Sequence, residues 1–314
     1  MTSAKKHRMA EGYGARVFRA VKKNWQLYVL LLPALIWLAI FCYVPMYGIL
    51  LAFKDFSIRK GIAASPWAGL KYFEQFFSTA VAGTLIKNTL MLSLLSLLVV
   101  FPLPILFALL LNQLQSKRFK KFVQTASFAP YFVSNVVVVS IMTVILAPSS
   151  GFVNVLLQSF GSEPIMFMTR PEYFRSLYVV SQVWQSMGFN AIVYLAALTG
   201  ISPDLHEAAI VDGANKLQRI IHIDIPTIMP TIVIMLILAI GSIMTVGYEK
   251  VYLMQSGMNT SVSEIISTYV YKVGLLNAQY SFSTAVGLFN SISNFILLLA
   301  ANLITRKVAG LGIF

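Results

Sequence analysis

Charged residues are scarce in this sequence: they make up 11% of its 314 residues, whereas 58% are hydrophobic. Soluble domains carry about 25% charged residues, so a bilayer is indicated as the solvent of most of this chain. Acidic residues are the scarcest, with 11 Asp and Glu against 24 Lys and Arg. The basic residues stand between apolar runs rather than along one solvated face. This distribution is typical of membrane topology signals and argues against a nucleic-acid partner.

Reactive and metal-binding side chains are scarce as well. The one cysteine, Cys42, excludes an intrachain disulfide, and its apolar surroundings favour a small buried hydrophobe. The sequence has no phosphate-binding G-x-x-x-x-G-K-[ST] loop and no H-E-x-x-H or C-x-x-C metal spacing. His206 and His222 lie in a polar loop, which favours solvated histidines. We therefore expect no catalytic residue, no metal site and no cofactor in this chain, and a membrane enzyme is poorly supported.

Six stretches contain no Asp, Glu, Lys or Arg at all. Each is longer than the roughly 20 residues that a helix needs to cross the hydrocarbon core, and a chain in lipid must satisfy its own backbone hydrogen bonds. In the third stretch, the Pro148-Ser149-Ser150-Gly151 break predicts a span over 122–147 followed by a surface helix over 152–160. The sixth span is predicted to begin near Ser281. The fold class is therefore all-α and membrane-integral with six transmembrane helices, drawn from residues 27–53, 88–116, 122–162, 176–203, 225–248 and 273–305.

The distribution of basic residues predicts the orientation of these helices. Residues 1–26 form a basic segment that we expect in the cytoplasm, before a transmembrane domain over 27–314. The dense cluster at 117–121 resists translocation in the same way, so both termini are predicted inside. The first span is longer than the 7–15 apolar residues of a signal peptide, so we expect it to be retained. The first outer loop runs against this trend, with Lys54, Arg59, Lys60, Lys71 and Lys87.

The predicted spans carry no ionisable group that could couple transport to protons or sodium. Carriers of that kind usually keep Asp, Glu, His or Lys inside the membrane. A self-powered carrier is therefore disfavoured, and the energy for any uphill transport must come from a partner.

The loop over 202–226, between the fourth and fifth spans, has the signals of a short helix. Ser202 can cap it, Pro203 suits its first position, and Gly213 can supply the left-handed turn that ends it. A second helix is expected to run on toward Pro226. Because small side chains on one helical face allow close packing, Leu205, Ala208 and Ala209 could press into a groove of another protein. An ordinary connector between spans fits these residues equally well.

This loop resembles the cytoplasmic signature of binding-protein-dependent ABC importer permeases of the type I class. The match comprises Glu207-Ala208-Ala209, then Gly213, then Ile223-Asp224-Ile225-Pro226, in which Ile225 replaces the usual Leu. Further segments resemble the carbohydrate-uptake branch, above all permeases for complex oligosaccharides, similar to the lipoprotein-linked polysaccharide permeases. They are Leu31-Leu32-Pro33, Tyr43-Val44-Pro45-Met46-Tyr47-Gly48, Ala52-Phe53-Lys54-Asp55-Phe56, Lys87-Asn88-Thr89 and Tyr194-Leu195-Ala196-Ala197-Leu198.

The resemblance implies a function and a set of partners. The loop would be a coupling helix that docks on a separate ATPase and drives alternating access, with ATP and Mg²⁺ used by the ATPase alone. The partners would be a sister permease in a heterodimer, two ATPase copies, an extracytoplasmic solute-binding protein and an oligosaccharide, in the inner membrane of a bacterium. Amino acids or peptides are the weaker substrate alternatives. The implied docking residues are Leu205, Glu207, Ala208, Ala209, Gly213, Ile223 and Pro226.

Candidate substrate contacts follow from the chemistry of sugars, whose ring faces stack on aromatic side chains while amides meet their hydroxyls. The fourth span offers both kinds of group, and the end of the fifth span and the interior of the sixth span offer more. Helix packing explains amides and small residues in membranes equally well. The outer basic residues Lys54, Arg59, Lys60 and Lys71 could meet an acidic binding protein or a uronate sugar, although simple solvation is favoured. The candidates are Gln182, Trp184, Gln185, Phe189, Tyr248, Glu249, Asn290 and Asn294.

Overall fold

The computed structural model describes residues 21–245 and 247–310, and these residues fold into helices without any strand. Of the predicted basic segment over 1–26, residues 1–20 lie outside the described residues. The first half of the described chain contains α2 (Trp25–Leu38), η2 (Ala39–Tyr43), α3 (Val44–Met46), η3 (Tyr47–Phe53), α4 (Gly61–Ala64), α5 (Lys71–Ser78), α6 (Ala80–Leu95), η4 (Ser96–Val100), α7 (Pro102–Asn112), α8 (Lys117–Phe128), η5 (Ala129–Phe132), α9 (Asn135–Ile145) and α10 (Phe152–Ser159). The second half contains α11 (Pro171–Thr199), α12 (Pro203–Val211), α13 (Lys216–Arg219), η6 (Ile220–Asp224), α14 (Ile225–Gly241), α15 (Tyr248–Met254), α16 (Thr260–Ser263), α17 (Ile266–Tyr271), η7 (Lys272–Leu276) and α18 (Tyr280–Ala309).

Four continuous helices of the described chain are long and apolar enough to cross a membrane, namely Trp25–Phe53, Ala80–Asn112, Lys216–Gly241 and Tyr280–Lys307. A bent pair, Lys117–Phe132 with Asn135–Ile145, makes a fifth if it counts as one span. The fourth predicted span corresponds to α11, which is 29 residues long. It is less apolar than the others because Gln182, Gln185 and Asn190 interrupt its hydrophobic residues.

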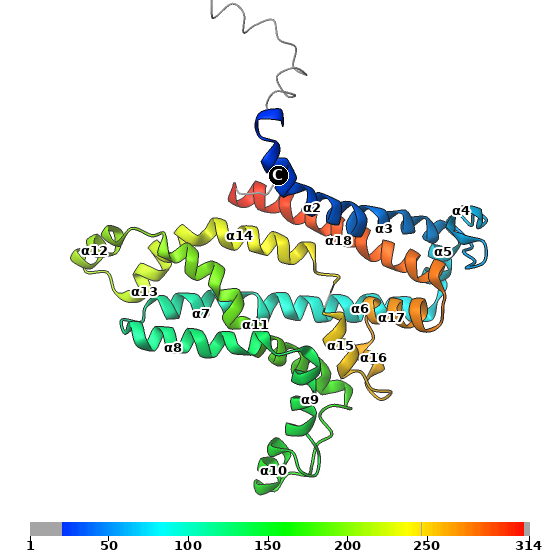
Figure 1. Cartoon of the computed structure of the whole chain (residues 1–314). Helices are drawn as coiled ribbons and strands as arrows, with labels where there is room; N and C mark the ends of the chain where they lie inside the picture. Colours follow the sequence, from blue (N-terminus) through cyan, green and yellow to red (C-terminus); the bar gives the residue numbers. More distant parts are fainter. Residues whose placement is uncertain (1–20, 246, 311–314) are drawn as a thin grey trace, which may run out of the picture.

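The long helices run roughly alongside one another, and the short elements gather at their ends (Figure 1). The helix pair α12 and α13 lies beyond one end, whereas α4 and α5 lie beyond the opposite end. The helix α11 packs against α7, α8 and α14, so it connects the middle of the bundle to α12.

The helical rod from α2 to η3 is attached mainly through its far end. Every residue from 25 to 47 is exposed, including Cys42, which corrects the expectation of a buried thiol. Farther along, η3 packs against α18. The Ser281 hydroxyl donates to the Lys54 carbonyl at 2.6 Å and accepts from the Phe56 amide at 3.0 Å. An apolar helix exposed on all sides needs lipid or another membrane subunit around it.

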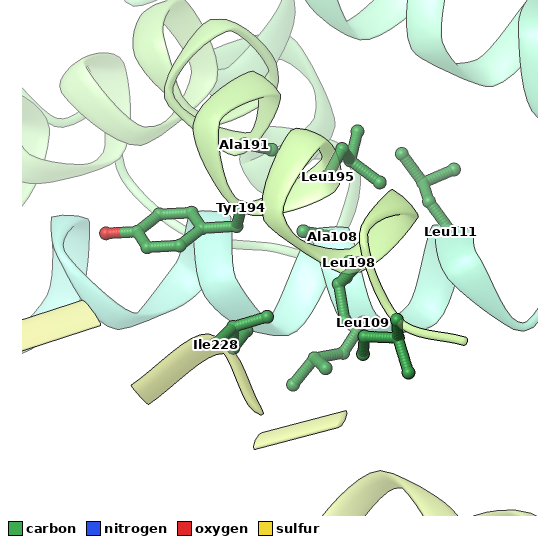
Figure 2. Packing of buried hydrophobic residues seen from close by; sticks show 9 residues of the cluster. Ala108, Leu109, Leu111, Ala191, Tyr194, Leu195, Leu198 and Ile228 are labelled. Atoms are coloured by element: carbon green, nitrogen blue, oxygen red, sulfur yellow. The ribbon is translucent and has the colours of Figure 1, made fainter. Parts of the chain in front are cut away.

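A tightly packed cluster of buried side chains joins α7, α11 and α14 (Figure 2). Ala108 of α7 and Ala191 of α11 have no exposed surface. Such small residues let two membrane helices approach closely. The larger members fill the space around them toward the α12 end: Leu109, Leu111, Tyr194, Leu195, Leu198, Ile201 and Ile228.

The third predicted span is not a straight helix over 122–147. Its two halves meet at 99°, between η5 and α9. Pro130 lacks the amide hydrogen that a continuing helix would need. A new helix begins where the Ser134 hydroxyl accepts from the Val137 amide at 3.4 Å. The predicted surface helix over 152–160 is present as α10.

The fifth predicted span ends at Gly241 rather than at Tyr248. Its chain then leaves the helix and is held by α18: the Asn294 amide oxygen accepts from the Met244 amide at 2.8 Å, and its nitrogen donates to Thr245 Oγ1 at 2.8 Å. The Ser93 hydroxyl donates to the Ile243 carbonyl. The absence of charged residues therefore made the predicted fifth span too long. The backbone leaves the helix because side chains of other helices form hydrogen bonds with it in place of those of a continued helix.

Candidate functional sites: a docking loop and a polar cavity

The loop over 202–226 forms the two helices that its sequence predicts. Ser202 caps α12 by accepting from the Asp204 amide at 3.3 Å, and Pro203 is its first residue. Gly213 adopts a φ of +80°, the left-handed conformation that ends the helix. Asn215 then caps α13 in a capping box with Gln218, at 2.9 and 2.8 Å. These local bonds make the loop a rigid projection rather than a loose connector.

Several apolar side chains of α12 are exposed. Leu205, Ile210 and Val211 are 52%, 54% and 87% exposed, and Glu207 and Ala208 are exposed beside them. Ala209 points the other way, into a cavity of about 300 Å³ between α12 and α13 that Gly213 and Ile223 also line. Exposed apolar side chains on a rigid helix are suited to docking on another protein.

A buried carboxylate anchors α12 to the bundle. Asp224, where η6 meets α14, has a fully buried side chain, and its Oδ1 lies 3.2 Å from His206 Nε2 of α12. No aligned hydrogen bond reaches Oδ1, so the two side chains touch without a well-aligned hydrogen bond. Gln113, directly after α7, donates to Asp224 Oδ2 at 3.1 Å. His206 is therefore not the solvated histidine that we expected, whereas His222 is exposed.

Pro226 stands in the first turn of α14 but inside the continuous helix Lys216–Gly241, so the second helix of the loop runs on into the fifth span without the expected junction. Ile223 precedes it in η6 and packs against the buried cluster of α7, α11 and α14. The coupling loop is thus connected to three long helices at once: through Gln113 to α7, through Asp224 to α14, and through α12 to the end of α11.

A second candidate site is a polar cavity of about 370 Å³ beside the middle of α11, here called the α11 cavity. Gln182 and Gln185 of α11 both point their amide oxygens at Lys250 of α15, at 3.0 and 2.5 Å. The Gln185 nitrogen donates to the Val133 carbonyl at 2.7 Å, which fixes the orientation of that amide. Lys250 is only 2% exposed.

The bent third span supplies the opposite wall of the α11 cavity. Tyr131 stacks on Phe189 of α11 with ring centroids 3.7 Å apart and planes 4° apart. Asn135 donates to Glu249 Oε2 at 2.6 Å. Tyr131, Asn135 and Glu249 all line the cavity, so it presents an aromatic ring, an amide and a carboxylate as well as the lysine.

A smaller cavity of about 320 Å³ adjoins the α11 cavity, because Gln182 and Gly247 line both. Its other polar lining comes from Asn190 of α11 and from Ser93, Ser96, Ser242 and Thr245. Amide and hydroxyl groups thus line both of these neighbouring cavities.

The structure gathers some of the predicted substrate residues and separates others. Gln182, Gln185, Phe189 and Glu249 lie at or beside the α11 cavity. The remaining candidates lie elsewhere.

Trp184 faces away from this group, into an apolar groove of about 430 Å³ between α9 and α11. Tyr248 lines a different cavity of about 820 Å³ with Tyr271 and Tyr280. Asn294 holds the end of the fifth span, and the buried Asn290 Oδ1 has no hydrogen-bond partner in the described chain. The candidates of the fourth span thus divide between two helix faces.

Sequence reasoning missed Lys250, Tyr131 and Asn135. Lys250 follows the predicted end of the fifth span, so its place in the sequence gives no sign of a position inside the bundle. The early end of α14 at Gly241 instead leaves enough chain to bring α15 back against α11. Tyr131 and Asn135 flank the bend of the third span, where Pro130 was the available signal.

Comparison with known proteins identifies the class of this chain. Residues 100–310 match the family described as binding-protein-dependent transport system inner membrane component. The polygalacturonan/rhamnogalacturonan transport system permease protein YteP of Bacillus subtilis (strain 168) is 45% identical over 92% of this chain and 90% of its own. Protein LplB of the same strain is 42% identical over 98% of this chain and 96% of its own.

Solved structures give the same result for the fold. A chain of a bacterial ABC transporter involved in the import of the acidic polysaccharide alginate superposes with a TM-score of 0.87 and 41% identity, covering 93% of this chain and 99% of that one. The alginate transporter in complex with an alginate pentasaccharide-bound periplasmic protein also gives 0.87, at 40% identity, with 95% of this chain and 100% of that chain covered. The sequence profile, the two relatives and the shared helical fold together establish that this chain belongs to the family of inner-membrane permease components of binding-protein-dependent ABC transport systems.

Proposed function

We propose that this chain is the permease subunit through which an ATP-driven importer takes up oligosaccharides delivered by an extracytoplasmic binding protein. The observation that carries the proposal is the connection between its two sites. The rigid, exposed α12 is joined to α7, α11 and α14, and α11 carries the polar cavity at its middle. A push on α12 can therefore move the walls of the cavity.

The proposal places six segments across the cytoplasmic membrane of a bacterium. They are the four long apolar helices, the bent pair of α8 and α9, and α11. Both termini and α12 would lie in the cytoplasm, with α4 and α5 outside. The family description, which names an inner membrane component, supports this location.

The proposal includes a sister permease and two copies of an ATPase. The exposed apolar residues of the rod from α2 to η3, and of the α9–α11 groove at Trp184, would otherwise meet only lipid. ATP binding by the ATPases, with their Mg²⁺, would draw the coupling helices together and open the pair to the outside, and hydrolysis would reset it. Glu207, Ala208 and Leu205 would touch the ATPase, while Ala209 and Gly213 shape the turn behind them. This chain would need no catalytic residue because the coupling is mechanical.

Acidic oligosaccharides are the substrate class that we propose. Polygalacturonan, named for one relative, is a polymer of uronic acids, and the alginate of the related transporter is described as an acidic polysaccharide. Aromatic, amide and hydroxyl side chains along α11 supply the groups that a sugar requires.

Co-purification tests the coupling part of the proposal. A tagged chain should bring down a sister permease and an ATPase, and Glu207→Lys should lose the ATPase alone. The matched control is Glu172→Lys, since Glu172 is an exposed glutamate at the opposite end of α11. Wild-type protein that purifies alone and transports sugar in liposomes without ATP would instead be a self-powered carrier. Uptake of peptides or amino acids in place of sugars would overturn the substrate class.

A further inference from the structure

Lys250 carries a buried positive charge that its own chain does not neutralise. Its amine lies 3.0 Å from Gln182 Oε1 and 2.5 Å from Gln185 Oε1, and both partners are neutral amides. Among the described residues no carboxylate lies within ion-pair distance of it, whereas Lys272, on the same side of the bundle, pairs with Glu264 at 2.9 Å. Glu249, its neighbour in sequence, is exposed and accepts from Asn135 instead.

A buried cation without a counter-ion is costly, so an anion that entered the cavity beside it would be stabilised. An ammonium group has three donors, and the two amide oxygens occupy two of them. Within the described chain the third donor has no acceptor, and the Lys250 side chain lines the α11 cavity. The two glutamines hold the ammonium in place, because Val133 fixes the amide of Gln185.

The rest of the cavity has the chemistry of a sugar subsite. Its volume of about 370 Å³ lies within the usual range of about 300–1,000 Å³ for small-molecule sites. Tyr131 offers a ring face, since only one of its faces is covered by Phe189. Asn135 and the Glu249 carboxylate can meet hydroxyl groups. A sugar that carries a carboxylate would satisfy the aromatic ring, the acceptors and the ammonium at the same time.

We propose that Lys250, held by Gln182 and Gln185, is the residue of the α11 cavity that binds the carboxylate of a uronate sugar and so selects acidic over neutral oligosaccharides. This inference rests on the proposed function of the chain as an oligosaccharide permease. It assigns a charge-selective subsite to the permease itself, so that selection does not depend only on the binding protein that delivers the sugar.

The competing explanation is structural: the lysine would only tie α15 to α11. The two explanations differ in what Lys250→Arg and Lys250→Gln do. Arginine keeps the charge, whereas glutamine keeps a hydrogen-bond donor and removes the charge. A tether needs only a donor, but a carboxylate site needs the positive charge. Lys272→Gln is the matched control, because it removes a lysine that Glu264 already neutralises.

The experiment uses the assembled complex of both permeases and the ATPases in nanodiscs. Equilibrium binding of radiolabelled trigalacturonate and of neutral maltotriose is measured for the wild type and the three variants, together with assembly by gel filtration. We expect Lys250→Gln to weaken trigalacturonate binding about tenfold or more, the worth of a charge-assisted hydrogen bond, and to leave maltotriose binding unchanged. Lys250→Arg should retain most of the affinity, and Lys272→Gln all of it.

The outcomes separate this inference from the proposed function. If wild-type complex binds both sugars equally, or if Lys250→Gln weakens both equally, the subsite is overturned while oligosaccharide import stands. Normal assembly together with unchanged trigalacturonate binding in Lys250→Gln would favour the tether and overturn the selective role. A wild-type complex that binds and imports neither sugar would overturn the proposed function together with the subsite.

Discussion

His206 on the projecting helix α12 and Asp224 at the buried start of α14 lie 3.2 Å apart, between Nε2 and Oδ1. Asp224 also accepts from Gln113 at the end of α7, so one carboxylate joins three elements. Only the α12 side of this junction is accessible, since the Asp224 side chain has no exposed surface. The junction is therefore the direct route by which a force on α12 reaches two long helices.

Removing the histidine should weaken this route without unfolding the protein. We expect His206→Gln to cost about 1 kcal/mol in the anchoring of α12, because it removes one partly exposed polar contact. Sugar uptake per ATP hydrolysed should fall, while the ATPase remains bound. The control is His222→Gln, since His222 lies in the same loop but bonds only to the Gln218 carbonyl at 2.9 Å. Equal sugar uptake per ATP hydrolysed in the wild type and in both variants would show that the contact does not contribute to coupling.

The apolar tip of α12 should contribute to ATPase docking. Val211 is 87% exposed, and a charge there would be trapped in the docked interface. We expect Val211→Asp to weaken ATPase binding by about 1–2 kcal/mol, measured as the dissociation constant on immobilised permease. Ile58→Asp provides the comparison, because Ile58 is 73% exposed at the opposite end of the bundle. A similar loss in both variants would point to general instability instead of docking.

Gly188 is required for the close approach of α11 and α8. A Cβ atom at this position would lie 2.2 Å from the Ser127 carbonyl oxygen, which is backbone and cannot move aside alone. We expect Gly188→Ala to destabilise the protein by about 1–3 kcal/mol, as overpacking does. Gly83→Ala in α6 should instead be neutral or stabilise by up to about 1 kcal/mol, because nothing lies within 4 Å of its added Cβ. Thermal unfolding in detergent distinguishes these opposite signs.

Asp55 should make the outer end of the protein sensitive to acid. The Tyr72 hydroxyl and the Lys71 ammonium, which lies 2.9 Å away, hold the pKa of Asp55 below its ordinary value of 3.8. The pKa of Asp55 is lower in the folded state than in the unfolded state. The stabilisation is therefore present above pH 3.8 and is lost as the pH falls through the lowered value. Asp55→Asn should therefore melt below the wild type at neutral pH, by a small margin for so exposed a pair. The difference should close in strong acid, and a gap that persists there would contradict the assignment.

The coupling loop was predictable from sequence because its determinants are local. Ser202, Pro203 and Gly213 affect the chain only within one or two helical turns of their own positions. Each of them occupies its expected position. The lengths of the stretches without charged residues likewise predicted most of the long helices. Such features depend on the residue types alone and require no knowledge of what lies across the bundle.

The polar cavity was only half predictable, because its remaining parts depend on contacts between distant segments. Gln182 and Gln185 could be recognised as unusual residues within a span. Lys250 joined them only because Asn294, 50 residues beyond Met244, ends the fifth span early. Absence of charge predicts where a helix can cross a membrane, but it does not reveal where another helix offers the backbone a better partner.

Ser281 forms one hydrogen bond with Lys54 and one with Phe56, and these partners lie 227 and 225 residues earlier in the sequence. During biosynthesis the rod from α2 to η3 enters the membrane first, and its partner α18 leaves the ribosome only after every other long helix has been made. Until then the outer end of the rod has the segment that follows it as a partner, as in the bond from the Ala68 amide to the Phe53 carbonyl at 2.8 Å, but it lacks its contacts with α18. A nascent chain that stops short of α18 would therefore expose the apolar rod without the helix to which its outer end is bonded in the complete fold.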